Sequence, residues 1–189
     1  MDPRDRLGIV VSGSLTDGLT VRLDGQVSVE EIAVGRYVVA EGERFRFFGM
    51  ITDVRLGLLS EQFRLTPPPI SDPFIAQVVR GTGTFGLIEV APMLTLPLGE
   101  EVTVDGPRPV KTIPAHFAPV FPARPGDVAA VFGREDETHF TIGTPVDMEQ
   151  VPVCLDLPRL VERSSGIFGK SGTGKTFLTR LVLIGIVQR

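Results

Sequence analysis

The stretch Gly169-Lys170-Ser171-Gly172-Thr173-Gly174-Lys175-Thr176 fits the pattern Gly-x-x-x-x-Gly-Lys-Ser/Thr, which is typical of phosphate-binding loops. The residues on either side have the types that such a loop requires: residues 165–168 predict a short buried strand, and residues 177–188 predict a helix. The glycines let the backbone curl so that its N–H groups point inward, and the N-terminus of the following helix adds about half a positive charge. We therefore predict a cradle for a polyphosphate.

Two side chains of this loop have expected roles. The ammonium group of Lys175 would reach the β- and γ-phosphates, and the hydroxyl of Thr176 would bind the Mg²⁺ ion that bridges them. The sequence thus predicts ATP and Mg²⁺ as cofactors, with residues 169–176 binding the nucleotide and Thr176 as the metal ligand. The competing explanation is a chance match in a chain with 21 glycines, and the strand-loop-helix context disfavours it.

Length and composition are those of a soluble globular protein of one or two domains, with 189 residues, 42% of them hydrophobic and 22% charged. The single cysteine, Cys154, excludes an internal disulfide and suits a reducing compartment. Residues 1–6 are charged and contain no apolar segment of signal-peptide length. The most apolar run, residues 178–187, contains Arg180 and is shorter than the roughly 20 residues of a membrane helix. We expect it to be a buried helix in a cytoplasmic protein without a membrane partner.

With a net charge of −4, the chain lacks the excess positive charge that is typical of nucleic-acid-binding domains. If DNA is a partner, most of the phosphate contacts must come from other parts of the assembly, because those contacts need clustered Lys and Arg side chains.

Upstream of the loop, 16 prolines and most of the glycines are spread along the chain, which predicts short strands joined by tight turns. Gly49, in the middle of a long β pattern, predicts a bend or bulge. Pro92, Pro97, Pro107 and Pro109 are expected to divide the later part into short pieces. Together the β patterns predict a small closed barrel of six or more strands; they cover residues 7–11, 19–23, 35–41, 45–56, 73–80 and 85–90.

The segment between the barrel and the loop has mixed patterns. Residues 114–125 contain four prolines and are expected to form a connecting loop, while residues 127–132 and 139–143 predict two strands joined by a charged turn. Asp156 is expected to cap a short helix that has Pro158 in its first turn. We therefore expect a β-domain with its connecting segment over residues 1–145, and the first part of a nucleotide-binding α/β domain over residues 146–189.

One helix follows the phosphate-binding loop in this chain. A complete nucleotidase also needs further parallel strands, an acidic residue that holds Mg²⁺ from a later strand, and a group that positions the attacking water. No catalytic residue of these kinds can be located in the sequence. We therefore expect these parts outside the 189 residues, and no ATP hydrolysis by this chain alone.

Three weaker patterns favour structural roles. Residues 81–86 fit Gly-x-Gly-x-x-Gly, but the residues that follow predict a strand and not the helix of a dinucleotide site. His116 and His139 have no companion ligand at metal-binding spacing. Phe45, Phe47 and Phe48 could form a stacking platform for single-stranded nucleic acid, but without a basic groove a core position is favoured.

Taken together, three groups of residues resemble the HerA-like ATPases: residues 35–39 and 48–53 of the expected barrel, residues 153–157, and the loop at residues 169–176. The resemblance implies that the barrel is the HAS-barrel. From its β patterns, the chain as a whole is expected to be mostly β. The resemblance also implies a hexameric motor, related to the FtsK translocases, that moves double-stranded DNA through a central channel by ATP hydrolysis, often beside a nuclease. In this resemblance Lys175 and Thr176 match the family's phosphate and Mg²⁺ residues, whereas its acidic Mg²⁺ residue, catalytic Glu and Arg finger have no counterpart here.

Two other functions stay open at this point. The chain could be a non-catalytic assembly and interaction module whose nucleotide site is inert, or it could belong to a motor that acts on protein substrates. Nucleotide titration separates the first alternative from a ring ATPase, and stimulation of ATPase activity by duplex DNA separates the second, since that stimulation should fall as salt rises.

Overall fold

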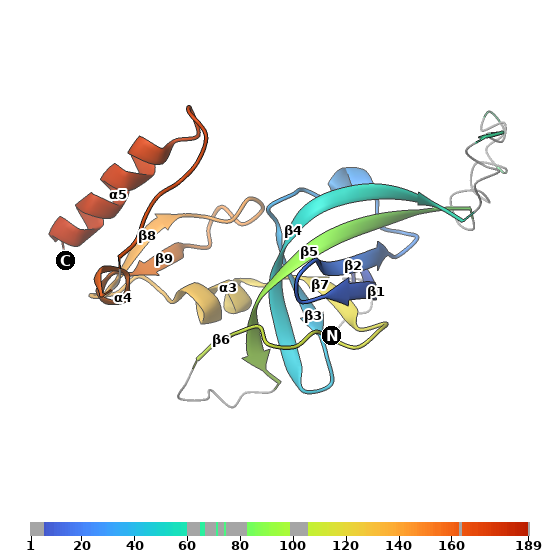
Figure 1. The fold of residues 1–189 in the computed structure, drawn as a ribbon, viewed down its shortest axis with the longest axis horizontal. Coiled ribbons are helices and arrows are strands. Elements are labelled where there is room, and N and C mark those ends of the chain that lie inside the picture. The colour runs from blue at the N-terminus through green and yellow to red at the C-terminus, as the bar shows by residue number, and fades with distance from the viewer. Residues whose placement is uncertain are drawn as a thin grey trace. The chain divides into compact units, whose positions relative to one another are not determined.

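The computed structural model describes residues 6–59, 65, 66, 71, 74, 83–98, 106–162 and 164–188. The contacts within the chain form two compact units, Met1–Ala123 and Arg124–Arg189. The domain limits expected from the sequence, 1–145 and 146–189, stay a prediction. Figure 1 labels the elements of both units.

The first unit is a closed β-barrel, as the sequence predicted. Six strands form a ring in the order β2-β1-β7-β3-β4-β5, which closes because β2 also pairs with β5, and β6 extends the sheet beyond β5 (Figure 1). A short 3₁₀ helix, η2 (Val29–Glu31), follows β2. The strands are β1 (Gly8–Ser14), β2 (Gly18–Leu23), β3 (Tyr37–Glu41), β4 (Phe45–Leu58), β5 (Thr84–Pro97), β6 (Arg108–Pro109) and β7 (Pro119–Pro122).

Alternation of apolar and polar residues along the strands fills the barrel. In β2, Leu19, Val21 and Leu23 are buried, whereas Arg22 between them is exposed, which is the period-two pattern of a sheet with one covered face. Fully buried Ile51 and Ile88 join the same cluster from β4 and β5. The barrel therefore has a continuous apolar interior of its own.

Burial explains two of the three phenylalanines at the start of β4. Phe47 and Phe48 are buried, and the Phe48 ring lies 4.9 Å from that of Tyr37, centroid to centroid. Phe45 is the exception, with 38% of its surface exposed. The core interpretation is thus confirmed for Phe47 and Phe48.

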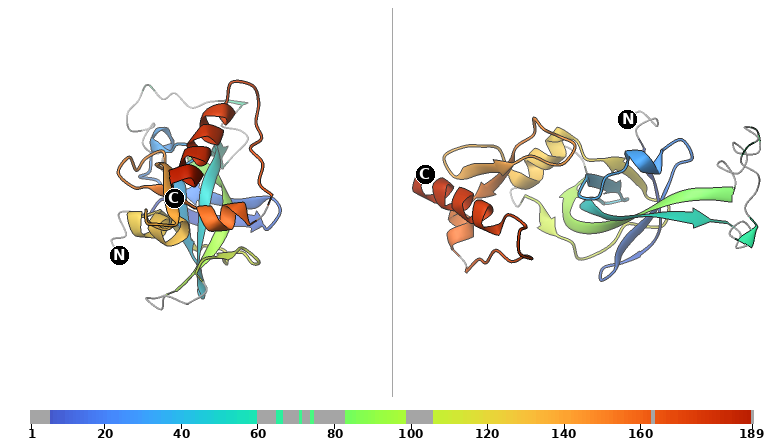
Figure 2. Two further views of the ribbon diagram at one scale, coloured as in Figure 1. Left: turned by 90° about the vertical axis from the view of Figure 1, so that its left-hand side faces the viewer. Right: turned by 90° about the horizontal axis from the view of Figure 1, so that it is seen from above.

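Strands β4 and β5 are the longest in the barrel, and they run side by side with two irregularities of register (Figure 2). One falls between Phe48 and Gly49, where the bend was predicted. A Cβ at Gly49 would lie 2.7 Å from the carbonyl oxygen of Ala91, so only glycine fits there. The expectation that Pro92 and Pro97 divide this region is wrong, since both lie within β5. Pro92 lies opposite Gly49 at the irregularity, and a missing N–H group costs little at such a position.

Residues 114–125 contain a strand that the sequence did not indicate. β7 joins β1 to β3, with Val120 opposite Gly8 and Phe121 opposite Val39. The strand is four residues long and has a proline at each end, so the high proline content suggested a loop instead. This short strand nevertheless links β1 to β3 within the ring.

The second unit consists of α3 (Pro125–Phe132), β8 (His139–Gly143), β9 (Val153–Asp156), α4 (Leu157–Val161) and α5 (Lys175–Gln188), and β8 and β9 form an antiparallel pair. The strand expected at residues 127–132 is wrong, because these residues lie in helix α3. Pro125 stands in the first turn of α3, and the Asp127 carboxylate accepts a hydrogen bond from the Arg124 amide at 2.8 Å. The strand β8 and the cap of α4 are confirmed, the Asp156 side chain accepting from the Arg159 amide at 3.1 Å.

The buried strand expected at residues 165–168 does not form: these residues have no regular structure, and Phe168 is 93% exposed. A parallel strand of this kind is stabilised by neighbours on both sides, and none of the described strands pairs with it. Helix α5 is confirmed, but it is not the buried helix that we expected, because Gly185 is its one buried residue. Within the described residues, no helix is both long enough and apolar enough to cross a membrane.

Candidate functional site

The predicted phosphate-binding residues form a tight turn directly before α5. Gly172 and Gly174 have φ angles of 81° and 83°, in the left-handed region that side chains other than glycine rarely adopt. These two glycines turn the chain back toward the start of the helix. The pattern of glycines that identified the motif thus has a direct conformational reason in two of its positions.

Contacts inside the loop hold the turn together. The Thr173 hydroxyl donates to the carbonyl oxygen of Lys170 at 2.8 Å, and the Thr173 amide points to the same oxygen at 3.4 Å. A Cβ at Gly169 would lie 2.8 Å from the Thr173 hydroxyl oxygen, so the start of the loop lies close to the Thr173 side chain. A larger residue at Gly169 would displace the Thr173 hydroxyl from this position.

The side chain of Lys175 folds back into this turn. Its Nζ atom donates to the carbonyl oxygen of Lys170, and Lys175 is half-buried while its neighbours in the loop are exposed. The ammonium group is therefore held inside the loop by one neutral acceptor. A phosphate oxygen would be a stronger acceptor, since hydrogen bonds between two charged groups are shorter and stronger than those to a neutral carbonyl.

The N-terminus of α5 adds donors to the same place. The first helical bond runs from the Leu178 amide to the Gly174 carbonyl at 3.0 Å, so the amides of Lys175, Thr176 and Phe177 precede the first bonded turn. Thr176 is exposed at this end of the helix. A lysine, a hydroxyl and unpaired helical amides form a donor set that fits a magnesium-bound polyphosphate.

A polar cluster at the start of β8 was not foreseen from the sequence. The Asp136 carboxylate accepts hydrogen bonds from the amides of Thr138 and His139, each at 2.8 Å, and its Oδ1 lies 3.0 Å from His139 Nδ1. These bonds, the Thr138 amide first, hold the pKa of Asp136 well below its usual range. The signal was the spacing Asp-x-x-His across a turn, which we interpreted only as a charged hairpin. The cluster fixes the turn into β8.

The other sequence patterns add no functional group within the part of the chain that the structure describes. Of the Gly-x-Gly-x-x-Gly pattern, residues 81 and 82 lie outside the described part of the chain, and β5 begins at Thr84. Cys154 is buried, with its Sγ 3.5 Å from the Thr141 hydroxyl. Among the residues that the structure describes, no three His, Cys, Asp or Glu side chains are grouped to hold a metal ion.

Each unit also has a concave region that the sequence did not suggest. In the barrel, a hollow of about 530 Å³ lies between the end of β2 and the start of β5, and there the Arg22 guanidinium lies 4.8 Å from the centre of the Phe85 ring. In the second unit, a hollow of about 310 Å³ is lined by α3 and by residues 150–152. Neither hollow is lined by a residue of the loop at 169–176.

Comparison with protein families matches both units. The HAS barrel domain matches residues 7–104, slightly more than half of the chain, and the central domain of the helicase HerA matches residues 140–189, which include all of the loop at 169–176. No curated protein matches the chain. The barrel described above is therefore a HAS barrel, and the loop lies in the HerA-type ATPase part. The chain belongs to the HerA-like proteins, with a HAS barrel followed by residues of the HerA central domain.

Proposed function

We propose that residues 169–176 bind MgATP and that the chain is the ATP-binding part of a HerA-like ring ATPase. The observation that carries this proposal is the loop itself: two glycines with positive φ, a lysine folded into the turn, and helical amides at the same end of α5. The match of residues 140–189 to the HerA central domain supports the same assignment.

In this proposal the loop residues bind different parts of the nucleotide and its metal ion. Lys175 would exchange the Lys170 carbonyl for a phosphate oxygen, the amides at the start of α5 would donate to the phosphates, and Thr176 would bind Mg²⁺. Mg²⁺ supplies neutralisation of phosphate charge when bound. The close approach of Gly169 to the Thr173 side chain would keep the loop narrow, so that its amides would converge on the phosphates.

We further propose that the complete cytoplasmic motor is a homo-oligomer, a hexameric ring, that moves along double-stranded DNA beside a partner such as a nuclease. The HerA match supports this proposal. The net charge of −4 indicates that other parts of the motor supply most of the contacts to DNA phosphates. The barrel would then serve assembly and partner docking.

Substitution of Lys175 tests the nucleotide proposal. In calorimetric titration of the 189-residue chain with MgATP, Lys175→Ala should weaken binding by about 1.5–3 kcal/mol, which is typical of a hydrogen bond to a charged group. The matched control is Lys111→Ala, a lysine that is exposed in the barrel unit, and its affinity should equal that of the wild type. Equal affinity for wild type and Lys175→Ala would contradict MgATP binding by residues 169–176. An assembly module with an inert nucleotide site would then be the remaining function.

A further inference from the structure

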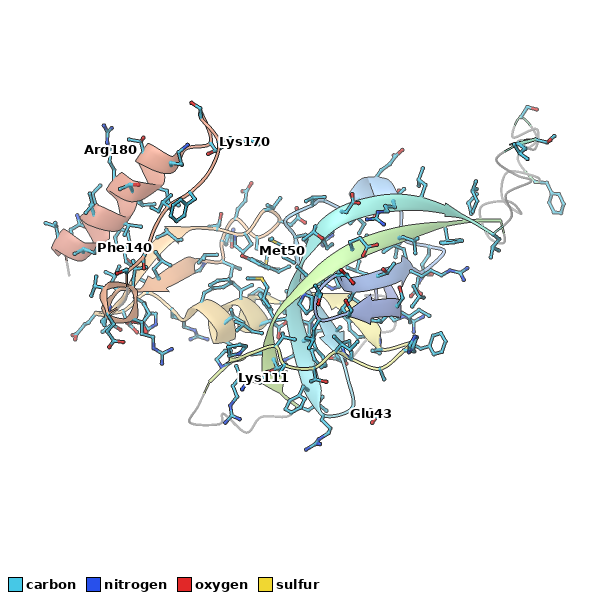
Figure 3. All side chains as sticks on the ribbon, viewed as in Figure 1. Glu43, Met50, Lys111, Phe140, Lys170 and Arg180 are labelled. Atoms are coloured by element: carbon cyan, nitrogen blue, oxygen red, sulfur yellow. The ribbon has the colours of Figure 1, made fainter. Side chains whose placement is uncertain are left out.

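Gly185 stands inside α5, where a glycine is unfavourable by about 1 kcal/mol relative to alanine. Packing explains its presence. A Cβ at Gly185 would lie 2.7, 2.8 and 3.2 Å from the Cδ1, Cγ and Cε1 atoms of the Phe140 ring on β8. Figure 3 shows the labelled Phe140 side chain beside α5. The helix backbone and the aromatic ring are thus in a contact that has no room for a methyl group.

This contact lies on the one covered face of α5. Leu181 and Val182 are half-buried and share a face with Gly185, as the spacing i, i+3, i+4 requires. On the other side of the helix, Ile184 and Val187 are 48% and 84% exposed. Within the described residues, α5 is therefore attached to the rest of its unit mainly around Gly185.

Both ends of the phosphate-binding loop are tied to the same β8–β9 pair. At the leading end, the Leu157 amide of α4 donates to the Thr138 carbonyl at 3.0 Å, and the Ser165 hydroxyl donates to the Leu160 carbonyl at 3.2 Å. At the trailing end, α5 rests on Phe140 through Gly185. The two attachments set the distance that residues 165–174 must span.

We propose that Gly185 and Phe140 are positioning residues for the nucleotide site: their contact fixes where α5, and with it Lys175 and Thr176, stands relative to the leading end of the loop. Lys175 lies about ten residues from Gly185, roughly 15 Å along the helix axis, so a shift at the contact is carried to the loop by a rigid element. This inference rests on the proposed binding of MgATP by the loop.

The test is Gly185→Ala in the 189-residue chain, titrated with MgATP. We expect binding to weaken by about fivefold or more, and we expect Phe140→Leu in the same chain to restore much of the loss, because the two residues are in contact and should couple. Alanine has a higher helix propensity than glycine. If Gly185→Ala changed only the stability of α5 and not its contact with Phe140, MgATP affinity would stay unchanged or improve. The matched control is Val187→Ala on the exposed side of α5, which should bind as the wild type does.

A ¹⁹F label on the Phe140 ring gives a second measurement that needs no nucleotide. Gly185→Ala should shift the ¹⁹F resonance, and Val187→Ala should not. A shifted resonance with unchanged MgATP affinity would overturn the positioning role while the nucleotide site stands. An unshifted resonance would show that Gly185 and the Phe140 ring are not in contact. Failure of the wild type to bind MgATP would instead overturn the proposed function together with this inference.

Discussion

The HAS barrel and the unit that carries the proposed phosphate-binding loop are stabilised in different ways. In the barrel, a closed ring of strands covers a continuous apolar cluster that includes Val21, Ile51 and Ile88, each with no measurable exposure. In the second unit, the helix that follows the loop keeps Phe177 at 73% and Val187 at 84% exposure. The barrel thus buries its apolar side chains within its own ring of strands, whereas the described residues cover α5 only around Gly185.

In the proposed function, the barrel is the scaffold, and the loop with α5 is the ligand-binding element. Regions with few buried apolar contacts open at lower free energy than a packed core does. We therefore expect α5 and the loop to exchange backbone hydrogens faster than β2, β4 and β5. Ligand binding at the loop would then be coupled to the ordering of α5.

The largest effect should come from the barrel core. Ile51→Ala removes buried methyl groups from a side chain with no exposed surface, so the free energy of unfolding should fall by about 2–5 kcal/mol. Urea unfolding followed by circular dichroism measures this loss. Leu56→Ala is the control on the same strand: Leu56 is 80% exposed, and the change should stay within about 0.5 kcal/mol. Similar losses for both variants would contradict the barrel as an independently packed core.

A smaller effect is expected in the second unit, at the turn before β8. Asp136 has its pKa lowered, chiefly by the Thr138 amide and then by His139. Because the pKa is lower in the folded protein than the roughly 3.9 of an unfolded chain, the ionised carboxylate stabilises the fold above that pH, and this stabilisation is lost as the pH falls through the folded pKa. Asp136→Asn should therefore lower the thermal midpoint at pH 7, and the gap to wild type should narrow below about pH 4.

The neighbouring Glu137→Gln variant serves as the control for that pH series. Glu137 is exposed and belongs to the same turn, so its removal tests whether any carboxylate at this place has the same effect. We expect its midpoint to follow that of the wild type at each pH. A gap for Asp136→Asn that stays constant down to pH 3 would show that the charge of this carboxylate does not stabilise the turn.

Local patterns predicted most of the barrel and the loop because those features depend on residues close in sequence. The alternation at Leu19, Val21 and Leu23 is a local consequence of one covered face, and Gly49 marks an irregularity that requires a missing side chain. The loop was identifiable because Gly172 and Gly174 meet a backbone requirement that no other residue meets easily. Here each sequence signal has a single physical cause.

The features that the sequence missed depend on partners far along the chain. β7 is a strand because β1 and β3 lie on either side of it, and a four-residue stretch with a proline at each end gives no sign of that. Residues 165–168 have the composition of a buried strand, but composition does not supply neighbouring strands. Helix α3 could have been found from Pro125 and Asp127 in its first turn, a signal that the apolar run at residues 128–132 obscured. The Gly185–Phe140 contact has no sequence signal beyond a glycine inside a helix.

The most direct test of the account is to map where MgATP binds. Backbone amide resonances of the ¹⁵N-labelled 189-residue chain should shift on addition of MgATP at residues 170–177, with smaller shifts along α5 toward Gly185. The hollow lined by Arg22 and Phe85 in the barrel should show none. Shifts confined to that hollow, or no shift at the loop at saturating nucleotide, would contradict the assignment of ATP to Gly169–Thr176.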